Sequence, residues 1–225
     1  MRKTLLILAV LLPAIGCRSG NGCLRNGDLI FVGHPDGFDT ETESMDAAIA
    51  SSTGKGGGLN LTHVAIAEVK GDSVWVIDAT LKRGVDRHPL DTFLTDSRYG
   101  DGRYPEFIVK RVTGIDADAA VERAKALCGR GYDVRFLPGN EELYCSELVQ
   151  ACYLDAEGHP VFESEPMNWL APDGTMPPYW ERLFGELGMD VPQGVPGTNP
   201  QKMSEAECLI EVPASGRIMC RPLAN

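Results

Sequence analysis

Histidine is scarce in this chain, and motifs for metal or phosphate binding are missing from it. The 225 residues include only four histidines, His34, His63, His88 and His159. There is no HExxH motif, no CxxC pair and no Cys/His set at zinc spacing. The glycine-rich run Gly54–Gly58 matches no phosphate-binding loop, because no GK[ST] ends it. We therefore expect no metal and no cofactor, and a metal-dependent hydrolase is the weakest enzyme hypothesis.

Positive charge is also in short supply. Lys and Arg total 21 against 32 Asp and Glu, which gives a formal net charge of -11 and a sequence pI of about 4.8. Proteins that bind nucleic-acid phosphates need clusters of Lys and Arg, so we expect no nucleic-acid partner. Hydrophobic residues make up 43% of the chain, which is enough for a core in one domain.

Long apolar runs are absent except at the N-terminus. Two basic residues precede the run Leu5–Leu12, and small residues then lead into Cys17. This layout is typical of a secretory signal peptide and is too short to span a bilayer. The small residues before Cys17 are similar to a lipobox, although Ala14 stands where Leu is usual. The alternative is an ordinary signal peptide cut nearby, with Cys17 incidental.

These features predict how the chain is organised. We expect a signal peptide over residues 1–16, a tether from lipidated Cys17 over residues 17–26, and a single hydrolase domain over residues 27–225. The protein is then exported and lipid-anchored to a bacterial membrane, facing the periplasm or the cell exterior.

Hydrophobic patterning predicts few strands and few helices, in segregated order, which favours an α+β fold. Lys70-Gly71-Asp72 separates two β-branched, apolar runs and so indicates a hairpin. The expected strands are Gly27–Gly33, Leu61–Val69, Ser73–Thr80 and Glu106–Val112. The expected helices are Ser44–Ser51, Ala117–Leu127 capped by Asp116, Cys145–Asp155 and Tyr179–Leu187.

The hairpin places a histidine and a carboxylate within reach of each other. With a loop of two or four residues, Ala65 pairs with Asp78, so His63 and Asp78 share one face on adjacent strands. An odd loop length would put them on opposite faces. Asp78 lies in an apolar run, and a buried carboxylate needs a partner. The alternatives are a structural His63 and an Asp78 bonded to loop backbone. His88, just past the hairpin, is predicted to lie on the surface.

Cys145 is the candidate nucleophile. Leu148, Val149 and Cys152 form an apolar helical stripe after it, which puts Cys145 in the first turn of a helix. The positive end of the helix dipole favours a thiolate there. The alternative is a buried core cysteine, as we expect for Cys128 and Cys152. Glu147 is interpreted as a solvated or capping residue.

The remaining cysteines leave their pairing open. They are Cys23, Cys128, Cys152, Cys208 and Cys220, an odd number. Export would permit disulfides, and Cys208 and Cys220 flank a Pro-Ala-Ser-Gly turn that suits a hairpin disulfide. Equally, these residues fit small buried hydrophobes.

Four motifs in this order, GDLIF, THVAI, VIDAT and YCSELV, resemble the YiiX/YebB-like branch of the NlpC-type papain-like cysteine peptidase superfamily. The resemblance covers about residues 24–155. In common members of the superfamily the cysteine helix comes first, whereas here it comes last. The chain therefore looks like a circularly permuted version, an arrangement shared with the lecithin retinol acyltransferase-like group.

The resemblance implies a fold and a set of roles. The fold is a small antiparallel sheet or barrel packed against helices, with the nucleophile at a helix N-terminus. Cys145 looks like the nucleophile and His63 the general base, and Asp78 falls where the family has a third, orienting polar residue, often Glu or His elsewhere. Tyr144 is frequent in this branch and is a candidate for substrate or oxyanion binding. The backbone N–H of Cys145 is a natural oxyanion donor.

Three functions compete at this point. The leading hypothesis is an amidase or endopeptidase that cleaves cell-wall peptides through a thioester intermediate, with a small peptide or amino-acid-containing substrate. The second is a lipid-directed acyltransferase or thioesterase, which needs an apolar groove leading to Cys145. The third is a non-catalytic binding protein on the same fold. Since folds host many functions, the site has to decide among them.

Overall fold

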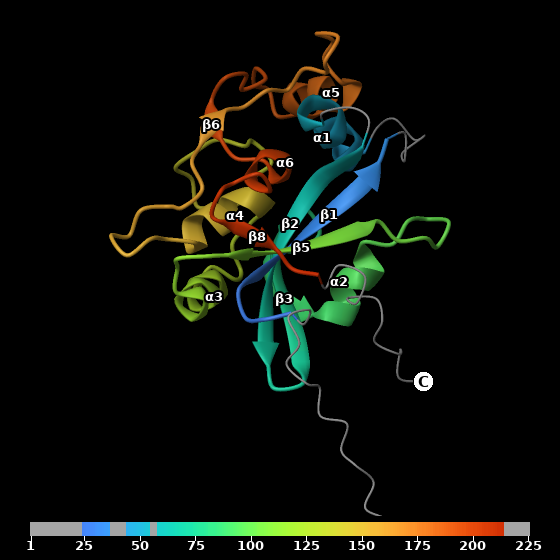
Figure 1. The fold of residues 1–225 in the computed structure, drawn as a ribbon. Helices are drawn as coiled ribbons and strands as arrows, with labels where there is room; N and C mark the ends of the chain where they lie inside the picture. The colour runs from blue at the N-terminus through green and yellow to red at the C-terminus, as the bar shows by residue number, and fades with distance from the viewer. Residues whose placement is uncertain (1–23, 37–43, 55–57, 214–225) are drawn as a thin grey trace, which may run out of the picture.

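A six-stranded antiparallel sheet, in the order β4-β3-β2-β1-β5-β8, forms the centre of the molecule (Figure 1). The computed structural model describes residues 24–36, 44–54 and 58–213. The predicted signal peptide, Cys17, Cys23 and Cys220 lie outside these residues. The strands of the sheet are β1 (Asp28–Pro35), β2 (Leu59–Lys70), β3 (Ser73–Thr80), β4 (Gly84–Pro89), β5 (Glu106–Val112) and β8 (Leu209–Glu211). A separate two-stranded sheet pairs β6 (Glu165–Pro166) with β7 (Pro196–Gly197).

The six described helices are α1 (Met45–Thr53), α2 (Leu90–Asp96), α3 (Ala117–Ala126), α4 (Cys145–Cys152), α5 (Pro178–Glu186) and α6 (Pro200–Met203). Side-chain caps fix three of their starts, because Ser44 accepts a hydrogen bond from the Ala47 N–H, Asp116 from the Ala119 N–H and Asn199 from the Lys202 N–H. The α+β prediction is therefore confirmed. Strand β4 and helix α2 were not predicted. In the described residues, no helix combines the length and apolarity needed to cross a bilayer.

The hairpin has the even loop length on which the site prediction depends. Lys70 pairs with Ser73, so only Gly71 and Asp72 form the connection. Gly71 has φ +57°, a left-handed conformation that glycine adopts without steric cost. Strand β3 begins and ends where the sequence predicted, at Ser73 and Thr80.

A β-bulge interrupts β2 next to its histidine. Val32 of β1 pairs with His63, but the next residue, Gly33, pairs with Leu61, so Thr62 is an extra residue in β2. A bulge bends a strand and turns its side chains, and bulges are frequent beside active sites. The direction of the His63 side chain is thus set by a local irregularity as well as by the strand.

The two faces of the sheet bury different hydrophobic groups. One face includes Phe31, Ile66 and Ile77, and packs against α3 and α4. The other includes Ala65 and Val76, and is covered by Phe93 of α2. In Figure 1, α3 and α4 lie on one side of the strands and α2 on the other. A third cluster gathers aromatic residues from the C-terminal half, and α1 packs against it.

A buried ion pair joins β1 to β5. Asp28, fully buried, accepts hydrogen bonds from Nε of Arg111 at 2.6 Å and from its Nη2 at 2.8 Å. The backbone N–H of Arg25 donates to the same carboxylate. This bidentate geometry fixes the register of the two strands.

Replacing Arg111 with Met should destabilise the protein by about 3–5 kcal/mol, because it leaves the Asp28 carboxylate buried without its charge partner. Urea unfolding followed by circular dichroism measures the change. The control is Arg103→Met, which breaks the exposed Arg103–Asp101 pair and should cost much less, because water screens that pair. Equal losses for the two variants would contradict this account of the Asp28 pair.

Candidate active site

His63 and Asp78 form a hydrogen bond across β2 and β3. Nε2 of His63 lies 2.9 Å from Oδ2 of Asp78. Asp78 is 2% exposed, and its neighbours in β3, Ile77 and Ala79, are fully buried. The buried carboxylate thus has the histidine as its partner, as the even hairpin loop predicted.

Cys145 meets His63 from another part of the chain. It is the first residue of α4 and is buried, and its thiol is close enough to the His63 ring to raise the pKa of that imidazole. Since Nε2 of His63 faces Asp78, Nδ1 is the ring nitrogen left to exchange a proton with the thiol. The backbone N–H of Cys145 is among the first four of the helix, which have no acceptor within it. The structure therefore brings Cys145, His63 and Asp78 together, with His63 hydrogen-bonded to Asp78 and in electrostatic contact with Cys145.

The surroundings favour a protonated His63. Burial by itself lowers the pKa of the imidazole, but the hydrogen bonds to Asp78 and Cys145 and their negative charges outweigh it. The net result is a His63 pKa well above its ordinary value of 6.5. An imidazolium beside Cys145 is the arrangement that stabilises a thiolate.

The prediction that His88 lies on the surface was wrong. His88 is in β4 and is only 6% exposed. Its Nε2 lies 3.8 Å from Oδ1 of Asp78, on the opposite side of the carboxylate from His63. The sequence pattern did not indicate a buried strand here, because β4, GVDRHP, contains few apolar residues.

Tyr144 lies on the far side of Cys145, in the aromatic cluster. Its hydroxyl accepts a hydrogen bond from the Thr198 N–H at 2.9 Å, and burial raises the pKa of Tyr144 to about 12. The hydroxyls of Thr198 and Ser146 are also 2.9 Å apart and buried. These contacts tie the C-terminal segment to the start of α4. The role of Tyr144 in substrate or oxyanion binding stays a prediction.

Glu147 acts as a cap, which was one of the roles expected for it. It accepts a hydrogen bond from the Tyr144 N–H at 3.4 Å. Burial and the nearby charge of Asp133 raise the pKa of Glu147 to about 7, against the opposing effect of the Tyr144 hydrogen bond. The cap fixes the backbone on which Cys145 starts the helix.

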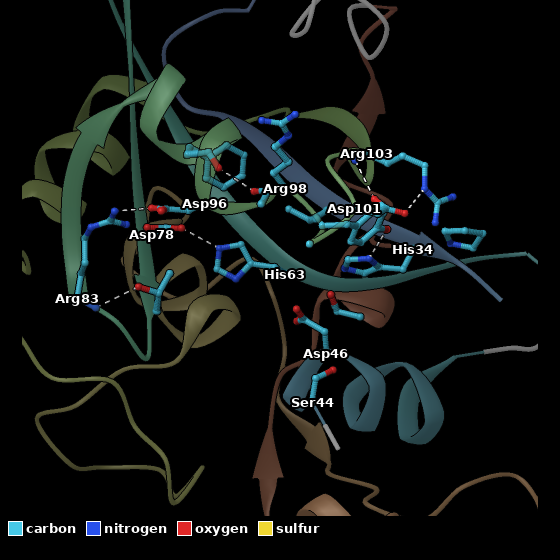
Figure 2. A pocket seen from close by; sticks show the side chains of 18 of the residues that line it. His34, Ser44, Asp46, His63, Asp78, Arg83, Asp96, Arg98, Asp101 and Arg103 are labelled. Atoms are coloured by element: carbon cyan, nitrogen blue, oxygen red, sulfur yellow. Dashed lines mark hydrogen bonds and ion pairs between the residues drawn. The ribbon is translucent and has the colours of Figure 1, made fainter. Parts of the chain in front are cut away.

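A polar cleft of about 880 Å³ opens beside His63 and Asp78 (Figure 2). Its walls come from β1, β2, β3, β4, the first turn of α1, α2 and the loop after α2. The charged residues that line it include Asp46, Arg83, Asp96, Arg98, Asp101 and Arg103. Within the described residues, the C-terminal segment contributes no wall of this cleft.

On the other side of Cys145 the space is small and apolar. A cavity of about 30 Å³ lies there, walled by aromatic side chains that include Phe136, Trp169 and Trp180. That volume holds about one water molecule. His63 and Asp78 thus line the polar cleft, whereas Cys145 lines the small aromatic cavity.

The other described cysteines are not paired. Cys128, Cys152 and Cys208 are free thiols. Cys152 is fully buried, as expected, and burial raises its pKa to about 12. The same prediction for Cys128 was wrong, because its side chain packs against the core while only partly buried. Of the proposed hairpin disulfide, Cys208 is free and Cys220 lies outside the described residues.

Comparison with known proteins agrees with the geometry. Residues 23–212 match the family model described as permuted papain-like amidase enzyme, YaeF/YiiX, C92 family. The chain is 24% identical over 218 residues to the uncharacterized protein YiiX of Escherichia coli strain K12, covering 94% of this chain and 96% of that protein. The crystal structure titled metalloprotein yiiX, from Escherichia coli O157:H7, superposes with a TM-score of 0.63 at 23% identity, covering 84% and 96% of the two chains. The fold is therefore the permuted papain-like one.

The raised pKa of His63 predicts a pH-dependent contribution to stability. The contribution is fully present below the unfolded-state pKa of about 6.5 and is lost as pH rises through the higher folded-state pKa. His63→Gln should therefore lose more unfolding free energy, relative to the unsubstituted protein, at pH 6 than at pH 9 in urea titrations. The matched control is His159→Gln, at a side chain that is 77% exposed. Its loss of unfolding free energy, relative to the unsubstituted protein, should be the same at pH 6 and pH 9. A gap for His63→Gln that grows with pH would contradict the assignment.

Proposed function

This chain belongs to the permuted papain-like amidase family, and from that premise we propose that it is an exported enzyme that hydrolyses amide bonds in cell-wall peptides. Cys145 is the nucleophile, His63 the general base and Asp78 the residue that orients His63. The observation that carries the proposal is the placing of Cys145, at the start of α4, beside a His63 that is hydrogen-bonded to Asp78.

The reaction follows from this arrangement. The thiolate of Cys145 attacks the carbonyl carbon of the amide, and a tetrahedral oxyanion forms. Protonated His63 gives its proton to the amine as the C–N bond breaks, which leaves a thioester on Cys145. His63, now neutral, takes a proton from water, the resulting hydroxide attacks the thioester, and the acid is released. Asp78 holds Nε2 of His63 throughout, so that Nδ1 stays directed at the reacting sulfur.

The start of α4 supplies the stabilisation of the oxyanion. The backbone N–H of Cys145 has no acceptor in its own helix, and the helix dipole adds positive potential at the same point. Donors fixed in place before the reaction stabilise the developing charge at no further cost in reorganisation. The Glu147 cap keeps this backbone in position.

The shape and polarity of the cleft support a peptide-like substrate. A cleft of about 880 Å³ with acidic and basic walls suits a molecule that carries charged groups, as peptides with free amino and carboxyl groups do. A lipid-directed acyltransferase needs an apolar groove at the nucleophile. The apolar space at Cys145 is only about 30 Å³, too small for an acyl chain.

Location adds to the proposal from the sequence. The signal-like N-terminus and Cys17 are consistent with a lipid-anchored enzyme outside the cytoplasm, where cell-wall peptides are found. A soluble, tethered hydrolase domain would then reach substrates near the membrane surface.

The solved relative is described as a metalloprotein, which raises the question of whether side chains of this chain could ligate a metal ion. In the parts of the chain that the structure describes, no group of three or more His, Cys, Asp or Glu side chains is placed to hold a metal ion. The residues present therefore do not fit a metal site, and the steps above use only side chains and backbone of this chain.

Alkylation of Cys145 tests the nucleophile–base pair. We expect iodoacetamide to label Cys145 rapidly near pH 6, well below the unperturbed thiol pKa of about 8.5, as read by peptide mass spectrometry. His63→Ala should abolish this reactivity, because it removes the imidazolium that stabilises the thiolate. Cys152, in the same peptide region and buried, is the internal control and should stay unlabelled. An inert Cys145, or labelling that is indifferent to His63, would overturn the proposal.

Substrate class needs its own assay. Purified protein should release new amino groups from soluble cell-wall peptides, and Cys145→Ala should lower the rate by about 10⁴- to 10⁶-fold. Phospholipid and long-chain acyl thioester are offered in parallel as substrates of the alternative class. Turnover of the lipid substrates alone would reject the peptide proposal and favour the acyltransferase.

A further inference from the structure

We propose that His88 is a positioning residue that holds the second oxygen of Asp78 and so keeps the first oxygen directed at His63. This inference rests on the proposed function, because it assigns His88 a part in the same reaction. Asp78 then lies between two imidazole rings, one on each carboxylate oxygen.

The two oxygens of Asp78 are in unequal situations. Oδ2 is 2.9 Å from His63, whereas Oδ1 is buried and makes no hydrogen bond within the described residues. The nearest polar group offered to Oδ1 is Nε2 of His88, at 3.8 Å. A buried carboxylate oxygen without a donor is costly. Catalytic hydrogen bonds are often long before substrate binds and tighten afterwards, so a small approach of His88 completes this one.

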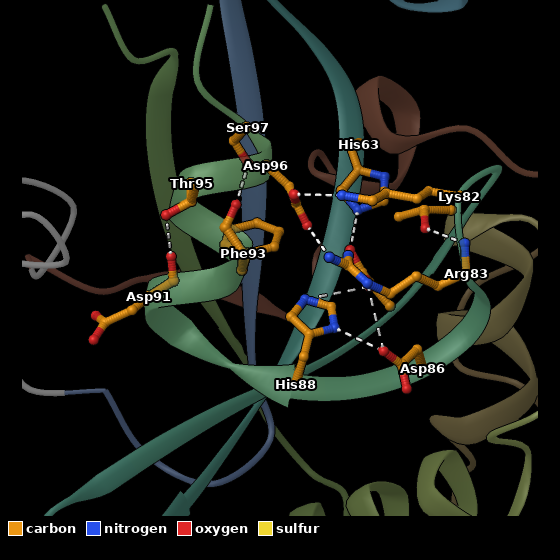
Figure 3. Close-up of polar contacts among 12 residues, drawn as sticks. His63, Lys82, Arg83, Asp86, His88, Asp91, Phe93, Thr95, Asp96 and Ser97 are labelled. Carbon is orange, nitrogen blue, oxygen red and sulfur yellow. Dashed lines mark hydrogen bonds and ion pairs between the residues drawn. The ribbon is translucent and has the colours of Figure 1, made fainter. Parts of the chain in front are cut away.

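The proton on His88 has two possible acceptors. Its Nδ1 lies 3.5 Å from Oδ2 of Asp86 (Figure 3). Its Nε2 lies 3.8 Å from Oδ1 of Asp78. A neutral imidazole carries one N–H and can serve only one of them. Asp86 has a side chain that is 41% exposed, so water can solvate it, and it also faces Arg83 at 3.8 Å. Asp78 is buried, so it lacks the solvation and the arginine contact that Asp86 has. This difference favours the tautomer of His88 with the proton on Nε2.

Packing holds the two rings in register. Phe93 of α2 stacks on both, with ring centroids 6.3 Å from His63 and 6.5 Å from His88. Asp78 and Asp86 are cross-strand partners, as are Val76 and His88. The remaining charged group on α2 near this face is Asp96, which is already paired with Arg83. No other described acid or base competes for the His88 ring.

The consequence concerns the direction of the carboxylate. With His88 in place, Asp78 cannot turn about its last bond without losing a partner on Oδ1, so Oδ2 stays in line with Nε2 of His63. Without the contact between His88 and Oδ1, the Asp78 hydrogen bond that raises the pKa of His63 weakens. His63 then stays protonated over a narrower range of pH.

Two substitutions of similar polarity separate this role from simple packing. In His88→Gln the side-chain amide nitrogen falls near the position of Nε2 and can still donate to Asp78. In His88→Asn the shorter amide reaches only the position of Nδ1, which faces Asp86. We expect His88→Gln to keep Cys145 alkylation at pH 6 within about threefold of the unsubstituted protein, and His88→Asn to lose about tenfold or more, as removal of a supporting hydrogen-bond partner commonly does.

The decisive readout is the titration of His63 itself, followed by NMR of the labelled imidazole in the full-length folded protein. His88→Asn should move the His63 midpoint down toward its ordinary value, and His88→Gln should leave it in place. The matched controls are His159→Asn and His159→Gln, at an exposed histidine that also faces an aspartate, and neither should move it. Thermal melts of all four variants identify any loss of folding.

The outcomes separate the two proposals. A His63 midpoint that is the same in His88→Asn and His88→Gln would overturn the role of His88, whatever the activity. Since the titration needs no turnover, it decides this role even if Cys145 of the unsubstituted protein shows no reactivity at pH 6. That second result would contradict the proposed function alone.

Discussion

The hydrogen bond between His63 and Asp78 is the interaction on which the rest of the site depends, and the two-residue turn of one hairpin makes it possible. A connection of odd length would have sent the two side chains to opposite faces of the sheet. The bulge at Thr62 adds a local bend beside His63, and the burial of Asp78 makes the bond hard to exchange for water. The orientation of the candidate base thus follows from one short piece of chain, and its raised pKa follows from Asp78 in that piece together with Cys145.

The nucleophile reaches this pair through a second set of constraints. Cys145 lies far along the chain from the hairpin, and its position depends on α4 packing against the sheet. The Glu147 cap and the contacts of Tyr144 with Thr198 fix the first turn of that helix from two directions. The permuted order of the chain therefore changes which segment arrives last, while the three reacting groups still meet at one point.

Several strands and helices and part of the candidate site could be predicted from the sequence, whereas other elements and contacts could not, for physical reasons. Strand β3, helix α3 with its Asp116 cap, and the shared face of His63 and Asp78 follow from local patterns, namely apolar alternation, a capping residue and a short turn. Strand β4 and helix α2 carry too little apolar periodicity to be recognised, so His88 was misplaced. The Tyr144–Thr198 contact joins residues 54 positions apart, and no local pattern encodes it. The family resemblance supplied the meeting of Cys145 with His63, which periodicity alone did not.

The link between Thr198 and Tyr144 also bears on when the enzyme becomes complete during its synthesis. The ribosome delivers the hairpin first, the nucleophile next, and the residue that ties down the start of α4 more than fifty residues later. A nascent chain therefore contains His63 and Cys145 before it contains Thr198, whose contact with Tyr144 stabilises the start of α4. The first turn of α4 therefore gains this contact only after Thr198 has been synthesised, and a chain cut short before Thr198 lacks it.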